Sequence, residues 1–149
     1  MVIALIGESC TGKSSIAQEL AAKTGGKIYT GKDYLKLAKS EAEAKIKFTG
    51  LLSDTVKSTD VLIYVISEPE HLTLLPEGCL RVVAKADLGI IKERFSKRMS
   101  GNMPPLVAAM LEQKHGMFDS LVCDVQIENC YGDVAEACNE ILRRAGYDI

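Results

Sequence analysis

The chain has 149 residues and a formal net charge of −2. This length is typical of one domain with a sizeable core, so we expect a single domain over residues 1–149. The near balance of charge excludes the strongly basic surface that attracts nucleic acids or anionic membranes, and we expect neither as a partner.

The cysteine content indicates a reducing compartment. Five cysteines are present, which is an odd number, and no two form a C-x-x-C pair: Cys10, Cys79, Cys123, Cys130 and Cys138. This pattern is typical of reduced thiols and not of a disulfide framework or a zinc site. No apolar run approaches the roughly 18 residues of a membrane span, and the first apolar run lacks the basic lead of a signal peptide. We therefore expect a cytoplasmic protein.

The first fifteen residues carry the strongest signal in the chain. Gly7–Ser14 fits G-x-x-x-x-G-K-[ST], the phosphate-binding loop or P-loop. Val2–Ile6 before it is an apolar run typical of a buried parallel strand, and Ser15–Lys23 after it has helical periodicity that ends at Gly25. A chance glycine-rich turn is the alternative, but the strand, loop and helix context favours a P-loop.

The chemistry of this loop points to a nucleoside triphosphate. Gly7 and Gly12 permit backbone angles and close approaches that a Cβ would obstruct. Loop amides at a helix N-terminus bind phosphate, Lys13 reaches the β- and γ-phosphates, and the Ser14 hydroxyl ligates Mg²⁺. We expect ATP and Mg²⁺ as cofactors, with the nucleotide held by Gly7, Glu8, Ser9, Cys10, Thr11, Gly12, Lys13, Ser14 and Ser15.

Strands and helices alternate along the rest of the chain. Between residues 27 and 78 the pattern predicts a strand over Lys27–Thr30, a helix over Asp33–Lys47, a break near Thr49 and Gly50, and a strand over Asp60–Ile66. Beyond residue 78 it predicts a strand over Leu80–Ala86, a helix capped by Asp87, a second helix from Pro104–Pro105 to Gly116, a strand over Leu121–Ile127 and a closing helix from Asp133.

Five strands alternating with helices predict an α/β fold with a parallel sheet covered on both faces. Ligands of such sheets lie beyond the carboxyl ends of the strands. We therefore expect the P-loop, Asp33, Glu68, Asp87 and Asn129 to surround one cleft.

The chain resembles the nucleoside-monophosphate kinase family of P-loop proteins, which includes guanylate and cytidylate kinases and the related shikimate kinases. The resemblance rests on Gly7–Ser14, on Glu93–Arg94 with Arg98, and on the segment 118–129 before the last helix. It implies a three-layer fold with a five-stranded sheet of order 2-3-1-4-5 and Mg²⁺-dependent phosphoryl transfer from ATP.

The same resemblance implies a mobile lid with arginines and a loop after the fifth strand that contacts adenine. It makes the helix pair at about 87–116 the lid, Arg94 and Arg98 its arginines, and Asn129 and Cys130 part of the adenine loop. The alternative for both arginines is a solvated helix flank with i,i+4 ion pairs.

Three residues or regions depart from the family pattern. Glu68 stands where these kinases often carry an Asp that holds Mg²⁺-bound water; it either takes that role or is an ordinary loop carboxylate. Cys10 stands where many members have glycine, either as an oxidation-sensitive thiol or as an inert small residue. No arginine precedes Arg81, although the family's acceptor pocket usually contains several.

The acceptor side offers Asp33 and nearby lysines. Asp33 either orients or deprotonates an acceptor hydroxyl, or it caps the following helix. Lys32, Lys36 and Lys39 share a helical face, which either holds an acceptor phosphate or is simply solvated. Tyr34 either stacks on a substrate ring or packs in the core.

These observations support two hypotheses. The first is a kinase that transfers the γ-phosphoryl group of Mg·ATP to a small-molecule acceptor, with a nucleotide or nucleoside as the favoured class. Its catalytic residues are Lys13, Asp33, Arg94 and Arg98, and its metal is held through Ser14 and Glu68. The second is a nucleotide-binding regulatory module with little or no transfer.

Overall fold

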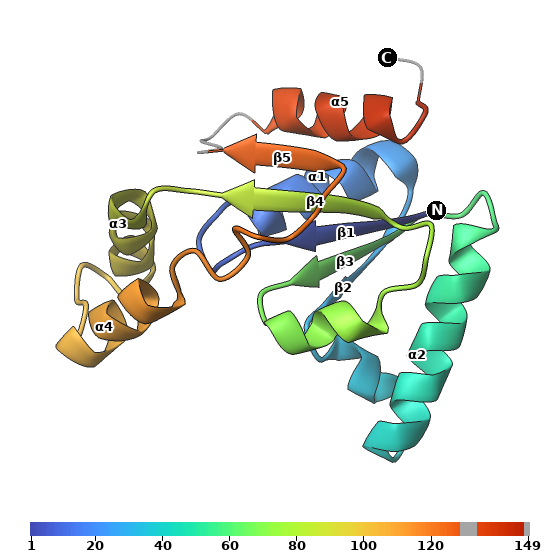
Figure 1. The fold of residues 1–149 in the computed structure, drawn as a ribbon, viewed down its shortest axis with the longest axis horizontal. Coiled ribbons are helices and arrows are strands. Elements are labelled where there is room, and N and C mark those ends of the chain that lie inside the picture. Colours follow the sequence, from blue (N-terminus) through green and yellow to red (C-terminus); the bar gives the residue numbers. More distant parts are fainter. Residues whose placement is uncertain (129–133, 148–149) are drawn as a thin grey trace.

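The computed structural model describes residues 1–128 and 134–147, which form a five-stranded parallel sheet between two layers of helices (Figure 1). The strands are β1 (Val2–Ile6), β2 (Lys27–Thr30), β3 (Leu62–Ile66), β4 (Leu80–Lys85) and β5 (Val125–Glu128). The helices are α1 (Lys13–Thr24), α2 (Glu41–Val56), α3 (Leu88–Arg98), α4 (Pro105–Lys114) and α5 (Ala135–Arg144), with 3₁₀ helices η1 (Asp33–Leu37) and η2 (Pro69–Leu74).

The strand order is β2-β3-β1-β4-β5, and every pair is parallel. This confirms the predicted fold class, a P-loop-type α/β fold in three layers with sheet order 2-3-1-4-5. β1 lies in the middle, and its last residue, Ile6, is in register with Ile66 of β3 and Val83 of β4. The loop after β1 therefore begins between the carboxyl ends of two neighbouring strands.

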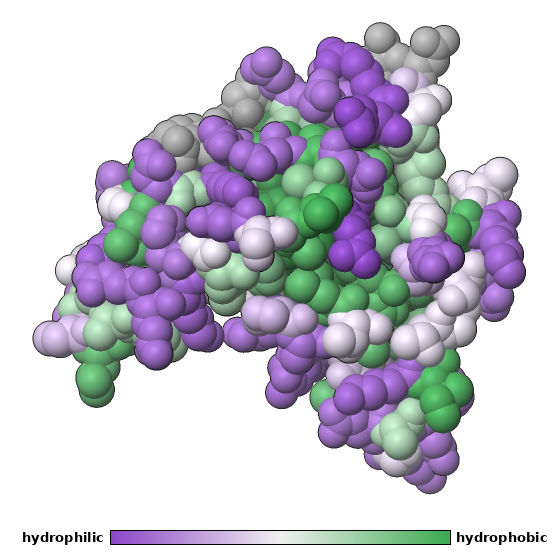
Figure 2. Space-filling model, viewed as in Figure 1, coloured by the Kyte–Doolittle hydropathy of each residue, from purple (hydrophilic) through white to green (hydrophobic). Residues whose placement is uncertain are grey.

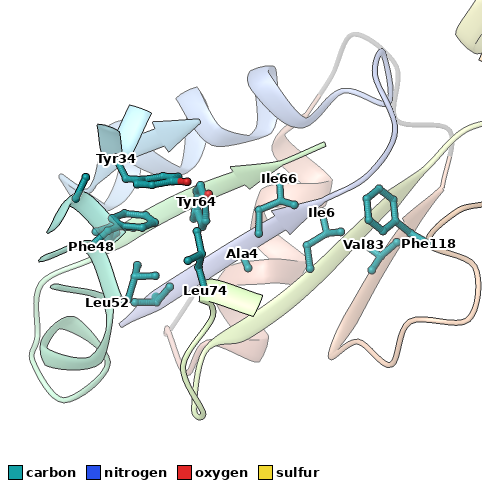
Figure 3. Close-up of a cluster of buried hydrophobic side chains, with 13 residues drawn as sticks. Ala4, Ile6, Tyr34, Phe48, Leu52, Tyr64, Ile66, Leu74, Val83 and Phe118 are labelled. Atoms are coloured by element: carbon teal, nitrogen blue, oxygen red, sulfur yellow. The ribbon is translucent and has the colours of Figure 1, made fainter. Parts of the chain in front are cut away.

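Successive residues of β1 enter opposite layers, as the two-residue period of a strand requires. Val2, Ala4 and Ile6 belong to a core formed with α2, η1 and η2, whereas Ile3 and Leu5 belong to a core formed with α1 and α5. Figure 3 shows part of the first core, where the rings of Tyr34, Phe48 and Tyr64 gather. Both faces of β1 are buried, which explains its uninterrupted apolar sequence.

The segment after β2 differs from the prediction. The helix predicted over Asp33–Lys47 is wrong: η1 ends at Leu37, and α2 starts afresh at Glu41. Ser40 is the N-cap residue, and its hydroxyl accepts a hydrogen bond from the Glu43 amide. The predicted break near Gly50 is also wrong, because α2 continues through this residue to Val56.

Helices α3 and α4 lie side by side beyond the carboxyl ends of β1 and β4 (Figure 1). They enclose a small apolar cluster of their own, which includes Ile91 and Leu111. Their surface is mainly hydrophilic in the view of Figure 2. Asp87 precedes α3 as predicted, but its side chain makes no capping hydrogen bond. None of the described helices is long and apolar enough to cross a membrane.

Candidate active site

The loop between β1 and α1 begins with a close backbone approach that only glycine permits. The Gly7 amide donates a 3.0 Å hydrogen bond to the Ile66 carbonyl of β3. A Cβ on Gly7 would lie 2.4 Å from the Ala84 carbonyl oxygen and 2.9 Å from Thr11 Oγ1, so any other residue would displace the loop or β4. The first glycine of the motif thus anchors the loop across the carboxyl ends of β3 and β4.

The loop ends at the N-terminus of α1. Gly12 is the N-cap residue in the left-handed region, with φ 94°, and no side chain caps the helix. The first turn of this 12-residue helix contains no acidic residue, and the Ser14 and Ser15 side chains are exposed. A helix N-terminus without side-chain caps or carboxylates favours an anion, because its free amides and dipole are both electropositive.

Lys13 is folded back onto the loop. Its ammonium group donates hydrogen bonds of 2.6 Å to the carbonyls of both Gly7 and Glu8, and only 5 % of the residue is exposed. Burial lowers the pKa of Lys13 to about 8; nearby Cys10 and Glu8 raise it, and the charge of Arg98 lowers it. A buried ammonium group with a lowered pKa is expected to gain from a phosphate beside it.

Two other loop residues face α3 and α4. Cys10 is 4 % exposed, adopts a positive φ of 64°, and packs in the apolar cluster with Ile91 and Leu111. Its carbonyl accepts a 2.9 Å hydrogen bond from Arg94. Glu8 accepts a 3.1 Å hydrogen bond from the Gly116 amide and lies 3.1 Å from His115 Nδ1. The burial of Cys10 favours the inert reading over an oxidation-sensitive thiol.

The two candidate lid arginines have different surroundings. Arg94 is half-buried and reaches the P-loop carbonyl of Cys10. Arg98 is exposed at the end of α3, yet its charge lowers the pKa of Lys13. Glu93 and Lys97 form the solvated i,i+4 pair on the outer side of the same helix. Arg98 is therefore the candidate whose charge is available to a ligand at Lys13.

The candidate acceptor residues occupy the neighbouring strand ends. The Asp33 carboxylate accepts a 2.9 Å hydrogen bond from the Thr30 amide, so it closes the turn after β2. Glu68 follows β3, and its carboxylate lies 3.4 Å from the Lys114 ammonium of α4. Tyr34 is buried and stacks on Phe48, which favours its core role. Lys32, Lys36 and Lys39 are exposed.

The remaining sequence predictions lie at the edges of this arrangement. Asp87 lines a cavity of about 180 Å³ together with Glu8, Lys85, Ala86, His115, Asp119 and Glu128. Asn129 and Cys130, the predicted adenine-loop residues, lie outside the described residues. No group of three or more His, Cys, Asp or Glu side chains able to hold a metal is found in the described ranges. Ser14, which the sequence predicts as the Mg²⁺ ligand, is exposed in the first turn of α1.

Sequence reasoning missed the residues at the end of α4. Lys114, His115 and Gly116 lie consecutively, and each contacts a site residue, either Glu68 or Glu8. Gly116 directly after a predicted helix was the available signal, since a glycine at this place ends a helix and turns the chain. Its partner in the P-loop, 108 positions earlier, leaves no mark in the local sequence pattern.

The fold matches those of known kinases. A shikimate kinase from Acinetobacter baumannii in complex with shikimate aligns with a TM-score of 0.64 and 15 % identity, covering 95 % of this chain and 90 % of that one. This chain has the fold of the P-loop kinases. A gluconokinase from Sinorhizobium meliloti 1021 also shares the P-loop kinase fold, with a TM-score of 0.59, 15 % identity and 97 % and 91 % coverage.

An uncharacterized protein from Eubacterium ventriosum ATCC 27560 aligns over 99 % of both chains with a TM-score of 0.69 and 16 % identity. No protein-family model and no curated protein sequence matches the chain. At these identities the comparisons show the fold alone.

Proposed function

We propose that this protein is a kinase that transfers the γ-phosphoryl group of Mg·ATP to a small-molecule acceptor. The observation that carries the proposal is the buried Lys13 at the uncapped N-terminus of α1, inside a glycine loop between β1 and the helix. Such a lysine is costly to bury without an anionic partner, because desolvation penalises its charge. A triphosphate at the loop would provide that partner.

Each residue of the site has a distinct task in this proposal. Lys13 exchanges its two carbonyl partners for phosphate oxygens, and the amides at the start of α1 bind the remaining phosphate charge. Arg98, whose charge lowers the pKa of Lys13, would add positive charge near the phosphates. The Ser14 hydroxyl would ligate Mg²⁺, and Glu68 would hold water on it. Bound Mg²⁺ would neutralise charge on the phosphate oxygens.

The acceptor is proposed to bind beside Asp33 and Glu68, which follow β2 and β3. A nucleotide or nucleoside is the class favoured by the sequence resemblance, and Lys32 would contact an acceptor phosphate as a point charge. The gluconokinase and the shikimate kinase add polyhydroxy acids to the candidates. Asp33 would accept the proton of an acceptor hydroxyl once it leaves the Thr30 amide.

A second candidate is a nucleotide-controlled regulatory module. The observation in its favour is that Glu8 is bonded to the segment directly after α4 and Cys10 to Arg94 of α3, so a change in the loop would move these helices. This function requires two conformations of the protein, and ATP and ADP must differ in their preference for one conformation over the other. Equal affinity for both nucleotides would remove its energetic basis.

The decisive experiment measures ADP formation from Mg·ATP across an acceptor panel. The panel contains nucleoside monophosphates, nucleosides, gluconate, shikimate and a blank without acceptor, and the control is Lys13→Ala. We expect one acceptor to raise the rate far above the blank and Lys13→Ala to abolish the increase while the fold is retained. Tight ATP binding with a flat panel would instead favour the regulatory module.

A further inference from the structure

Glu8 belongs to the variable part of the P-loop motif, yet its side chain is held by two contacts. Oε2 accepts a 3.1 Å hydrogen bond from the Gly116 amide, and Oε1 lies 3.1 Å from His115 Nδ1. Only 11 % of the Glu8 side chain is exposed. Its carboxylate therefore points into the segment after α4 and leaves the phosphate side of the loop to backbone groups.

The backbone of the same residue is bonded to the phosphate-binding residues. The Glu8 carbonyl accepts a 2.6 Å hydrogen bond from Lys13 Nζ and a 2.8 Å hydrogen bond from Thr11 Oγ1. Glu8 is thus joined through its carbonyl to Lys13 and through its carboxylate to the end of α4. A displacement of Lys13 toward a phosphate would release the carbonyl and alter the position of the carboxylate.

The helix pair has further attachments to the same loop. Arg94 of α3 donates a hydrogen bond to the Cys10 carbonyl, and the Cys10 side chain is buried between the two helices. Lys114 of α4 pairs with Glu68 at the end of β3. Within the described part of the chain, Glu8 both contacts the segment after α4 and accepts a hydrogen bond from Lys13, whereas Cys10 and Glu68 contact the helices without accepting one from Lys13.

We propose that Glu8 is a positioning residue that couples the α3–α4 pair to Lys13. Its carboxylate holds the segment after α4, and this contact sets where Arg94 and Arg98 lie relative to the loop. The effect of Glu8 on nucleotide binding rests on the proposed function. The contact of its carboxylate with the segment after α4 does not. Because coupling between two sites is reciprocal, loosening the attachment changes nucleotide affinity, and nucleotide binding changes the attachment.

Hydrogen exchange at the Gly116 amide tests the attachment in the protein without nucleotide. We expect Glu8→Ala to speed exchange of this amide by about tenfold or more, since a hydrogen bond to a charged acceptor is lost. Glu8→Gln keeps one acceptor oxygen and should give a smaller increase. Glu93→Gln, which breaks an exposed ion pair on the outer side of α3, is the matched control and should leave the amide unchanged.

Unchanged exchange of the Gly116 amide in folded Glu8→Ala would overturn the proposal. So would an equal increase in Glu93→Gln, because the effect would then be general loosening of the helix pair. Near-ultraviolet circular dichroism of each variant verifies that the fold is intact before exchange is compared.

A double-mutant cycle tests whether Glu8 acts on the nucleotide through α4. Dissociation constants for Mg·ATP are measured for wild type, Glu8→Ala, His115→Ala and the double variant. We expect the effects of the single substitutions to be non-additive, because both substitutions remove the contact between Glu8 and His115. Additive effects would contradict a coupling of Glu8 to the nucleotide through its contact with His115. If wild type binds no nucleotide, the proposed function fails. Hydrogen exchange at the Gly116 amide then decides alone whether Glu8 holds the segment after α4.

Discussion

Arg94 of α3 donates a 2.9 Å hydrogen bond to the carbonyl of Cys10, a P-loop residue 84 positions earlier in the chain. Cys10 itself has a positive φ and is buried in the apolar cluster of the helix pair. Arg94 therefore supports an unusual backbone conformation in the loop, whereas Arg98, one turn further on, stays exposed near Lys13. The two arginines of one helix face are expected to differ in function.

Substitution of each arginine should separate these functions. Arg94→Ala removes a hydrogen bond from a charged donor to the loop and should lower the free energy of unfolding by about 1–3 kcal/mol. Arg98→Ala should leave that free energy within about 0.5 kcal/mol of wild type, since the side chain is exposed. It should instead lower kcat/KM roughly 10²- to 10³-fold through lost charge stabilisation.

Urea unfolding and steady-state kinetics on the best acceptor measure both effects. A destabilised Arg98→Ala with normal kinetics, beside a stable Arg94→Ala, would reverse the assignment.

The pKa of Lys13 makes stability depend on pH in a defined direction. Its pKa in the folded protein is about 8, below the ordinary value of 10.5, so the unfolded chain binds this proton more tightly. The cost of burying the charge is fully present below pH 8 and disappears as the pH rises from about 8 to 10.5. Over that range wild type should gain up to about 1.4 kcal/mol per pH unit relative to Lys13→Met.

Urea unfolding of wild type and Lys13→Met at several pH values between 7 and 10 provides the measurement. Comparing the two proteins cancels the contributions of groups that titrate in both. A difference in unfolding free energy that stays constant across this range would mean that folding does not lower the pKa of Lys13.

Nucleotide binding should take up a proton above pH 8. Phosphate beside Lys13 favours the charged ammonium and raises its pKa, so the complex holds a proton that part of the free protein has lost. ATP affinity should be constant below about pH 8 and fall above it. Calorimetry at pH 9 in two buffers of different ionisation enthalpy measures the uptake, and Lys13→Met should show none. Proton release in wild type would contradict the contact.

The close approach at Gly7 predicts a large effect from one methyl group. In Gly7→Ala the new Cβ would lie 2.4 Å from the Ala84 carbonyl oxygen, so β4 or the loop must shift. We expect a loss of several kcal/mol of stability or a loop that no longer binds ATP. Gly50→Ala in α2 is the matched control: its Cβ meets nothing within 4 Å, and it should stabilise the helix by about 0.5–1 kcal/mol.

Thermal unfolding and ATP titration of the two variants check this prediction. Equal stability of Gly7→Ala and wild type, with normal ATP affinity, would show that the loop is not fixed against β4.

The sheet and the P-loop could be predicted from sequence because their signals are local. The apolar run Val2–Ile6 is buried on both faces, and the glycines and Lys13 have fixed spacing in the motif. The error in the α2 region also had a local signal that was overlooked: Ser40 and Glu43 have the spacing of a capping box, and Ser40 is the N-cap. Gly50 was overweighted as a helix breaker, although tertiary packing of Phe48 and Leu52 maintains the helix.

The attachment of the P-loop to α3 and α4 could not be predicted in this way. Glu8 and Gly116 are 108 positions apart, and Cys10 and Arg94 are 84 apart, so only the folded chain brings them together. Glu8 and Cys10 occupy positions that the motif leaves open, and their side chains are explained by packing against the helices. The motif predicts which loop atoms bind a ligand, but it does not predict the residues that support the loop.

Phosphorus NMR of the protein with Mg·ATP and the best acceptor tests the central claim most directly. We predict that the γ-phosphate resonance is replaced by that of a phosphoester on the acceptor, with an equal amount of ADP, and that Lys13→Met gives no new resonance. ATP that is bound but unchanged in the presence of every acceptor, or conversion to orthophosphate alone, would contradict the assignment as a kinase.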